Sequence, residues 1–223
     1  MTADAATRLL GRFVTHVAVV VEGDGVDLHL IGREEPFRAL RTHSFPLGFD
    51  SADLVLEEVV QLRAEGLDSI SDVNDRIDPR DTDVRVVSGL GDTVYHTLLA
   101  TPDVLPGGAS LDREFVAGYS GDLCISPRYE RLVEAVLGTD VLEGIGFSYP
   151  GDVAEEEAAI ADAGLGVYLT MTGSTARDHG LVVGENLFPS ETVLMENPAE
   201  GDEATDRARS ALLDADLSTA IEM

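Results

Sequence analysis

The sequence contains no lysine and no tryptophan, and its single cysteine is Cys124. One cysteine excludes an internal disulfide and a cysteine-based metal cluster. Because Cys124 stands in an apolar run, we expect it to be a small buried residue and not a nucleophile. No stretch approaches the roughly 18 apolar residues that a membrane helix needs, and residues 1–4 lack the basic start and apolar core of a signal peptide. These absences predict a soluble, cytoplasmic protein with no membrane partner.

Positive charge is scarce as well. All 15 basic residues are arginine against 42 Asp and Glu, which gives a formal net charge of -27 and a pI near 4.2. Without a basic stripe to neutralise phosphates, nucleic acid is excluded as a partner. The acids are spread from Asp4 to Glu222, whereas a nucleic-acid mimic or a calcium buffer needs them clustered. Since 44% of the chain is hydrophobic, disorder is excluded and the charge belongs to the surface. We interpret it as adaptation to molar salt, as in an extreme halophile.

The order of apolar runs predicts the secondary structure. Residues 13–31 read as a hairpin around Gly23-Asp24-Gly25, and residues 33–49 as irregular. β-Branched or aromatic runs predict further strands over residues 84–89, 93–100, 122–126, 141–149, 166–173 and 191–197. Apolar residues at helical spacing predict helices over residues 52–65, 127–137, 153–163 and 204–213. From residue 122 to 173, strands alternate with helices, which is typical of an α/β fold with a parallel sheet into which 84–100 should lead.

The most informative segment is residues 166–180, where a β-rich run ends in Thr172-Gly173-Ser174-Thr175. Glycine would let backbone N–H groups approach an anion, the three hydroxyls would add donors, and Arg177 would supply positive charge. Hydroxyl residues beside a glycine are also common at helix starts. Phosphate binding and simple capping both remain open on this pattern alone.

Several other side chains have two interpretations each. His16 and His29 lie on the predicted hairpin and could share a metal, but two histidines without a third ligand are more often solvated or in the core. His96 is expected in the core or at a cleft. The run 155–157 is expected to be a solvated acidic face.

Arg128 and Arg131 are one helical turn apart. They could face an anion, or they could pair with Glu130 and Glu134 on the same helix.

Residues 120–197 resemble the catalytic region of ATP phosphoribosyltransferases, the enzymes that open histidine biosynthesis. That family has a strand running into a Thr-Gly-Ser/Thr-Thr loop, then Asn-Gly-Leu, then a strand that ends in Asn-Pro. The matching stretches occur here in the same order, at residues 125–129, 146–155, 172–175, 179–181 and 190–198.

The resemblance implies a two-lobed α/β fold of the periplasmic-binding-protein type II kind with mixed sheets. Its two crossovers would lie near Thr101 and Leu181, which would place residues 1–100 and 181–223 in lobe I and 101–180 in lobe II. A stretch rich in proline and glycine, residues 101–108, agrees with the first crossover.

The resemblance also implies that the loop grips the 5′-phosphate of phosphoribosyl pyrophosphate, that Mg²⁺ holds the pyrophosphate, and that N1 of ATP displaces it. Asp162 and Asp178, which flank the loop, are the best available carboxylates for Mg²⁺. The chain departs from the family in having Tyr168 and Gly164 where the family has acids, and in lacking a lysine-containing loop near its start.

Three functions therefore remain open: a phosphoribosyltransferase, a catalytically silent paralogue that senses a small ligand or regulates a partner, and an interaction protein that retains the fold only. A homo-oligomer is compatible with each of them.

Overall fold

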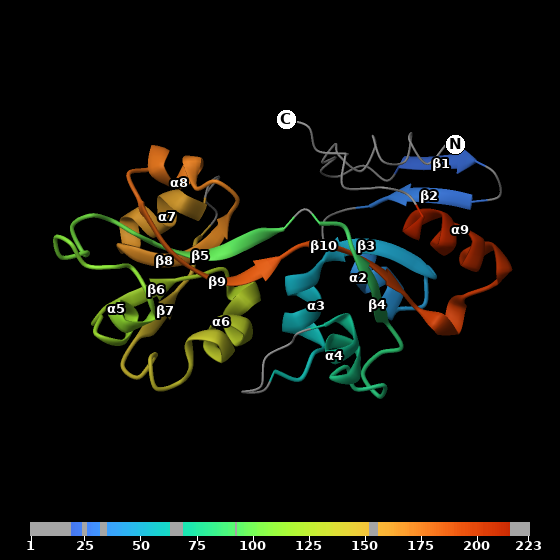
Figure 1. Ribbon diagram of the computed structural model, residues 1–223, viewed down its shortest axis with the longest axis horizontal. Helices are drawn as coiled ribbons and strands as arrows, with labels where there is room; N and C mark the ends of the chain where they lie inside the picture. The colour runs from blue at the N-terminus through green and yellow to red at the C-terminus, as the bar shows by residue number, and fades with distance from the viewer. Residues whose placement is uncertain are drawn as a thin grey trace. The chain divides into compact units, whose positions relative to one another are not determined.

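A computed structural model of the chain describes residues 19–23, 26–31, 35–62, 69–91, 93–151 and 156–214. The chain forms two compact units, of which unit 1 comprises residues 1–61, 65–92 and 191–223, and unit 2 comprises 62–64 and 93–190 (Figure 1). Apart from the short segment 62–64, the chain passes between units at 92/93 and 190/191, whereas the sequence placed these changes at 100/101 and 180/181. The difference arises because two strands, β5 (Val94–Ala100) and β9 (Val182–Ser190), pair with each other in the sheet of unit 2.

Unit 1 is built around a small antiparallel sheet with strand order β3-β10-β4. Its elements are β1 (Val19–Gly23), β2 (Val26–Leu30), α2 (Glu35–Arg41), β3 (Leu47–Ser51), α3 (Ala52–Glu58), α4 (Ile70–Asp75), β4 (Arg85–Gly89), β10 (Thr192–Glu196), the 3₁₀ turn η2 (Pro198–Glu200) and α9 (Glu203–Leu213). The predicted hairpin is confirmed for β1 and β2, which pair antiparallel. Residues 13–18 of that prediction lie outside the described residues.

Polar side chains fix the ends of these elements in unit 1. Asp50 of β3 accepts a hydrogen bond from the Phe37 N–H at 3.2 Å, which satisfies a first-turn donor of α2. The Asn74 side chain of α4 binds both backbone groups of Val86 in β4. Its amide nitrogen donates to Val86 O at 2.8 Å, and its amide oxygen accepts from Val86 N at 2.9 Å. The buried Asn197 donates to Leu40 O at 2.8 Å. These bonds tie backbone groups of α2 and β4 to side chains of neighbouring elements.

Unit 2 contains a five-stranded mixed sheet with order β7-β6-β8-β5-β9. Its elements are β5 (Val94–Ala100), α5 (Arg113–Ala117), β6 (Asp122–Cys124), the 3₁₀ turn η1 (Pro127–Tyr129), α6 (Glu130–Leu137), β7 (Gly146–Ser148), α7 (Glu156–Ala163), β8 (Leu165–Thr170), α8 (Ser174–Asp178) and β9 (Val182–Ser190). The expected parallel arrangement is confirmed for β6, β7 and β8. β5 runs antiparallel to both β8 and β9. The expectation that 84–89 also leads into this sheet is wrong, because β4 pairs with β10 in unit 1.

The unit 2 sheet has an apolar layer on each face. Figure 1 shows α7 and α8 on one side of it and α5 and α6 on the other. On the α7 side, Ile160 and Ala176 pack with Leu99, Cys124 and Leu181 in one buried cluster. On the other face His96 stacks on Phe188 and meets the Tyr129 ring edge-on. This layering is what allows β8 to deliver the loop that follows it from a fixed position.

Some sequence expectations need correction. Residues 33–49 are not irregular, because they contain α2 and the start of β3. The helix expected over 52–65 ends at Glu58, after which Val60 forms a bridge with Ile77. Only 146–148 of the strand expected over 141–149 is extended, and the residues before it form turns. Within the described part of the chain, none of the helices is both long enough and apolar enough to span a bilayer.

Candidate phosphate-binding site

The segment Thr172–Thr175, called the loop here, begins two residues after the end of β8, and its last two residues form the start of α8. Gly173 stands immediately before the helix with a left-handed backbone, φ +70° and ψ 15°. An L side chain rarely adopts this conformation, and a Cβ at this position would lie 2.8 Å from Val183 Cγ2. Glycine is therefore required here by both conformation and space.

The hydroxyl side chains of the loop point to solvent, since Thr172, Ser174 and Thr175 are all exposed. Thr172 Oγ1 lies 3.0 Å from Ser174 Oγ and accepts a weak hydrogen bond from the Ser174 N–H at 3.4 Å. Arg177 is exposed as well, and its Nη1 donates to Thr172 O at 2.8 Å. The structure thus brings together all the residues predicted for the loop, and the guanidinium lies against the loop backbone.

The next turn anchors the loop to the core. Leu181 N–H donates to Ala176 O at 3.0 Å, and both residues belong to the buried cluster under α7. Because β6, β7 and β8 are parallel, the loop lies at the edge of the sheet that their carboxyl ends share. Ligands of open α/β sheets characteristically bind at this edge.

A polar network beside the loop was not predicted from the sequence. Thr97 of β5 is fully buried, and its Oγ1 lies 2.7 Å from Thr170 Oγ1 and donates to Asn186 Oδ1 at 2.9 Å. Asn186 lies in β9, whose sequence VVGENLFPS contains glycine and proline and gives no strand signal. Without β9 assigned, nothing in the sequence could place the three side chains together.

The two carboxylates proposed for Mg²⁺ are at the ends of different helices. Asp162 lies near the end of α7 and Asp178 is the last residue of α8, and both are exposed. Among the described residues, no three His, Cys, Asp or Glu side chains are close enough together to hold a metal ion. The described residues therefore do not form a metal cage made only of protein ligands.

The remaining candidates fall mostly in the core. His96 is 2% exposed and belongs to the aromatic stack. Cys124 is buried as predicted, and burial raises the pKa of its thiol. Glu157 is buried, so the interpretation of 155–157 as a solvated face is wrong at that position.

Three other residues that the sequence singled out, His29, Arg128 and Glu130, each lie near an aromatic side chain. His29 is exposed, with its ring 4.8 Å from that of Phe45, while His16 lies outside the described residues. The Arg128 guanidinium lies 5.9 Å from the Tyr129 ring. Glu130, proposed as a partner of an arginine, accepts a hydrogen bond from the Tyr149 hydroxyl at 2.8 Å.

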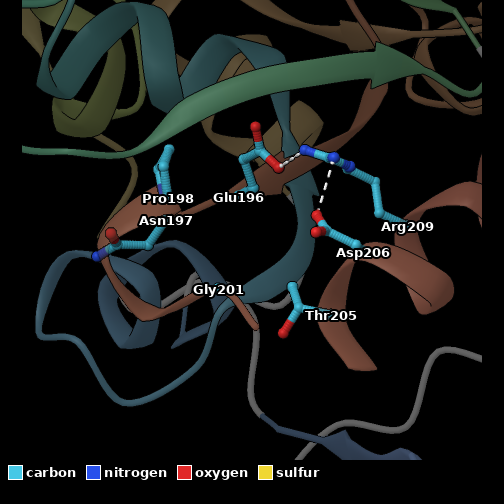
Figure 2. A pocket seen from close by; sticks show the side chains of 7 residues that line it. All are labelled: Glu196, Asn197, Pro198, Gly201, Thr205, Asp206 and Arg209. Carbon is cyan, nitrogen blue, oxygen red and sulfur yellow. Dashed lines mark hydrogen bonds and ion pairs between the residues drawn. The ribbon is translucent and has the colours of Figure 1, made fainter. Parts of the chain in front are cut away.

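A separate polar pocket lies in unit 1, where β10 ends and α9 begins (Figure 2). Arg209 reaches across it, donating to Glu196 at 2.6 Å and to Asp206 at 3.0 Å, as the dashed lines show. The hydrogen bond and charge of Glu196 raise the pKa of Arg209 further. The cation is thus already paired with two carboxylates, which makes this pocket a poor receptor for an anion.

Comparison with known proteins places this geometry in a class. The chain is similar to a chain of the ATP phosphoribosyl transferase (HisG:HisZ) complex from Thermotoga maritima, with a TM-score of 0.58 and 13% identity over 97% of this chain and 91% of that one. It is also similar to the ancestral amino acid-binding protein AncCDT-1, with a TM-score of 0.51 and 10% identity over 85% and 74%. The fold is that of the periplasmic-binding-protein type II class, with mixed sheets.

Within that class, the chain belongs to the halobacterial ATP phosphoribosyltransferase family, whose model matches residues 4–223. No curated protein sequence matches the chain significantly. Family membership confirms the resemblance drawn from residues 120–197.

Proposed function

We propose that the protein binds phosphoribosyl pyrophosphate and transfers its phosphoribosyl group to ATP. In this reaction N1 of the adenine forms a bond to the ribose C1, and the bond from C1 to the pyrophosphate oxygen breaks. Thr172, Gly173, Ser174 and Thr175 bind the 5′-phosphate, and Arg177 adds positive charge beside it.

One observation carries this proposal: a loop with an obligatory left-handed glycine and three exposed hydroxyls lies at the carboxyl end of β8. Backbone N–H groups and hydroxyls are the neutral donors that suit a phosphate, and the arginine supplies charge without needing the lysine that this chain lacks. Family membership supports the same reaction.

The metal in this proposal arrives with the substrate. Mg²⁺ is usually held by one or two carboxylates together with substrate phosphates, so the absence of a metal cage among the described residues fits an ion that is bound to pyrophosphate. Asp162 and Asp178 are the nearest carboxylates before and after the loop in sequence and are the ones we assign to it.

A second candidate is a catalytically silent paralogue that binds the same ligand as a sensor or a regulatory subunit. Tyr168 favours it, because this residue stands where the family resemblance predicts an aspartate. One similar structure is described as a HisG:HisZ complex, and we extend from it the proposal that this chain assembles with copies of itself or with a second subunit.

Calorimetric titration in 3 M KCl separates these functions. Phosphoribosyl pyrophosphate with Mg²⁺ should bind, and adding ATP should release pyrophosphate. Binding without ATP-dependent release supports the silent paralogue. Failure of wild-type protein to bind millimolar phosphoribosyl pyrophosphate would leave the loop as a helix cap only.

A further inference from the structure

The network formed by Thr97, Thr170 and Asn186 carries an inference about how the ligand's sugar is recognised. These residues lie on three adjacent strands of unit 2, with Thr97 paired opposite Asn186 in the β5–β9 ladder. Thr170 is two residues before Thr172. The network therefore lies within a few residues of the proposed phosphate loop.

Proton counting gives the network a direction. The Thr97 hydroxyl has one proton and faces two oxygens that can only accept, Asn186 Oδ1 at 2.9 Å and Tyr95 O at 3.3 Å. The shorter contact assigns the proton to Asn186 Oδ1. The 2.7 Å contact between the two threonine hydroxyls must then be donated by Thr170. With its oxygen held in this way, Asn186 has its NH₂ group left as a pair of donors, and Thr170 keeps lone pairs as an acceptor.

The outer ends of the network are accessible to a ligand. Asn186 is exposed and Thr170 is partly exposed, whereas Thr97 between them is fully buried. Within the part of the chain that the structure describes, the Asn186 amide nitrogen makes no hydrogen bond. A buried hydroxyl thus orients two outer groups that are free to bind.

We propose that Asn186 and Thr170, oriented by Thr97, bind the ring hydroxyls of a sugar phosphate whose phosphate occupies the loop. A sugar hydroxyl both donates and accepts, so it can donate to Thr170 Oγ1 and accept from the Asn186 amide. The network is neutral, so this chain reads the sugar without an acid at Tyr168, which pairs directly opposite Thr97 across β5 and β8. The inference rests on the proposed phosphate loop and adds the residues that distinguish one sugar from another.

Ribose 5-phosphate and 2-deoxyribose 5-phosphate test this by calorimetry in 3 M KCl. Wild-type protein should prefer ribose 5-phosphate by about threefold to tenfold, the usual value of one neutral hydrogen bond. Asn186→Ala should bring the ratio of the two affinities close to one while leaving inorganic phosphate binding unchanged. Thr97→Val should do the same, and Thr97→Ser should restore the preference, since the serine hydroxyl can still orient Asn186.

Two controls keep the outcomes apart. Ser120→Ala, at an exposed hydroxyl elsewhere in unit 2, should change neither ligand's affinity. Thr175→Ala should weaken the binding of both sugar phosphates equally and leave the ratio of their affinities unchanged.

An affinity ratio of one in wild type, or a ratio that Asn186→Ala does not change, overturns the sugar subsite alone. Loss of the ratio in Thr97→Ser as well would also overturn it, because the hydroxyl would then not be the orienting group. If the wild-type protein binds neither sugar phosphate, the proposed sugar subsite and the proposed phosphate loop are both contradicted.

Discussion

Gly173 and Thr175 lie two residues apart in the same loop, but we expect a substitution at Gly173 to lower stability and one at Thr175 to weaken ligand binding. Thr175 presents an exposed side chain, whereas Gly173 is buried against Val183 and has a positive φ. Substitutions in an exposed loop usually spare stability. That holds only for the exposed hydroxyl, since a side chain on Gly173 would strain the backbone and displace Val183.

At Thr175 we therefore expect a clean loss of function. Thr175→Ala removes one donor to a charged phosphate, worth about 1.5–3 kcal/mol, which corresponds to roughly ten-fold to hundred-fold weaker binding. Calorimetry with phosphoribosyl pyrophosphate measures the affinity, and a melting curve in the same buffer should be unchanged. Equal binding by the variant would show that the Thr175 hydroxyl does not contact the phosphate.

Gly173→Val should instead unfold more easily, because a left-handed conformation costs a non-glycine residue about 1–3 kcal/mol before any clash is counted. The midpoint of thermal unfolding should fall relative to wild type. An unchanged midpoint would mean that the loop backbone can move away from Val183.

Cys124 gives a second prediction for a single residue, since it is the only thiol in the chain. Burial raises its pKa, so less thiolate is present at a given pH, and the reagent must also wait for the core to open. Labelling with a maleimide at pH 7 should be slow in the folded protein and fast in denaturant. Rapid labelling under native conditions would contradict the packing of Cys124 beneath α7.

At the scale of whole elements, the strands richest in β-branched residues were predictable and those defined by their partners were not. β4, β5, β8 and β10 fall where their residues indicate. β9 contains Gly184 and Pro189, and it is extended because β5 pairs with it along most of its length. Gly184 also has to be glycine, because a Cβ would lie 2.4 Å from Leu111 O.

The candidate site also has one part that the sequence predicts and one part that it does not. The loop was predictable because its hydroxyls, glycine and arginine are adjacent in sequence. The Thr97–Thr170–Asn186 network was not, because its members come from strands that are neighbours only in the folded sheet. α2 was missed because its apolar face has only Phe37 and Leu40, which is too short a run to show helical periodicity.

The contact between α7 and β8 should depend on Gly166. A Cβ at this position would lie 2.5 Å from Cys124 O and 2.6 Å from Ile160 Cγ1, so strand and helix cannot both stay in place. We expect Gly166→Ala to lower the free energy of unfolding by about 1–3 kcal/mol, as is usual for overpacking. Gly107→Ala is the matched control, since its Cβ would meet nothing within 4 Å. Equal denaturant midpoints for the two variants would refute the close approach.

The composition of the whole molecule sets its response to salt. With 42 carboxylates and 15 arginines, most acids have no cation to pair with. Some of the pairs that do form are exposed on both sides, as the pair of Arg38 with Glu35 is. Exposed pairs contribute little, so local bridges cannot offset a net charge of -27. The repulsion among these acids must be reduced by the solvent.

Salt supplies that reduction by shortening the range of the repulsion. The Debye length is about 3 Å at 1 M salt and about 10 Å at 0.1 M, so dilution lets carboxylates interact that were screened before. Compact states carry this cost more than unfolded ones, because folding brings the charges closer together. We therefore expect the melting temperature to fall when KCl is lowered from 3 M to 0.1 M.

Salt also strengthens apolar burial when it is excluded from the protein surface, so screening must be separated from exclusion. Sucrose is excluded in a similar way but carries no charge. If repulsion dominates, sucrose added at 0.1 M KCl should recover only part of the lost melting temperature, whereas restoring KCl should recover all of it. Full recovery by sucrose would assign the effect to apolar burial. A melting temperature that is equal or higher in 0.1 M KCl would show that the acidic surface is no adaptation to salt, because the folded protein would then tolerate its unscreened charge.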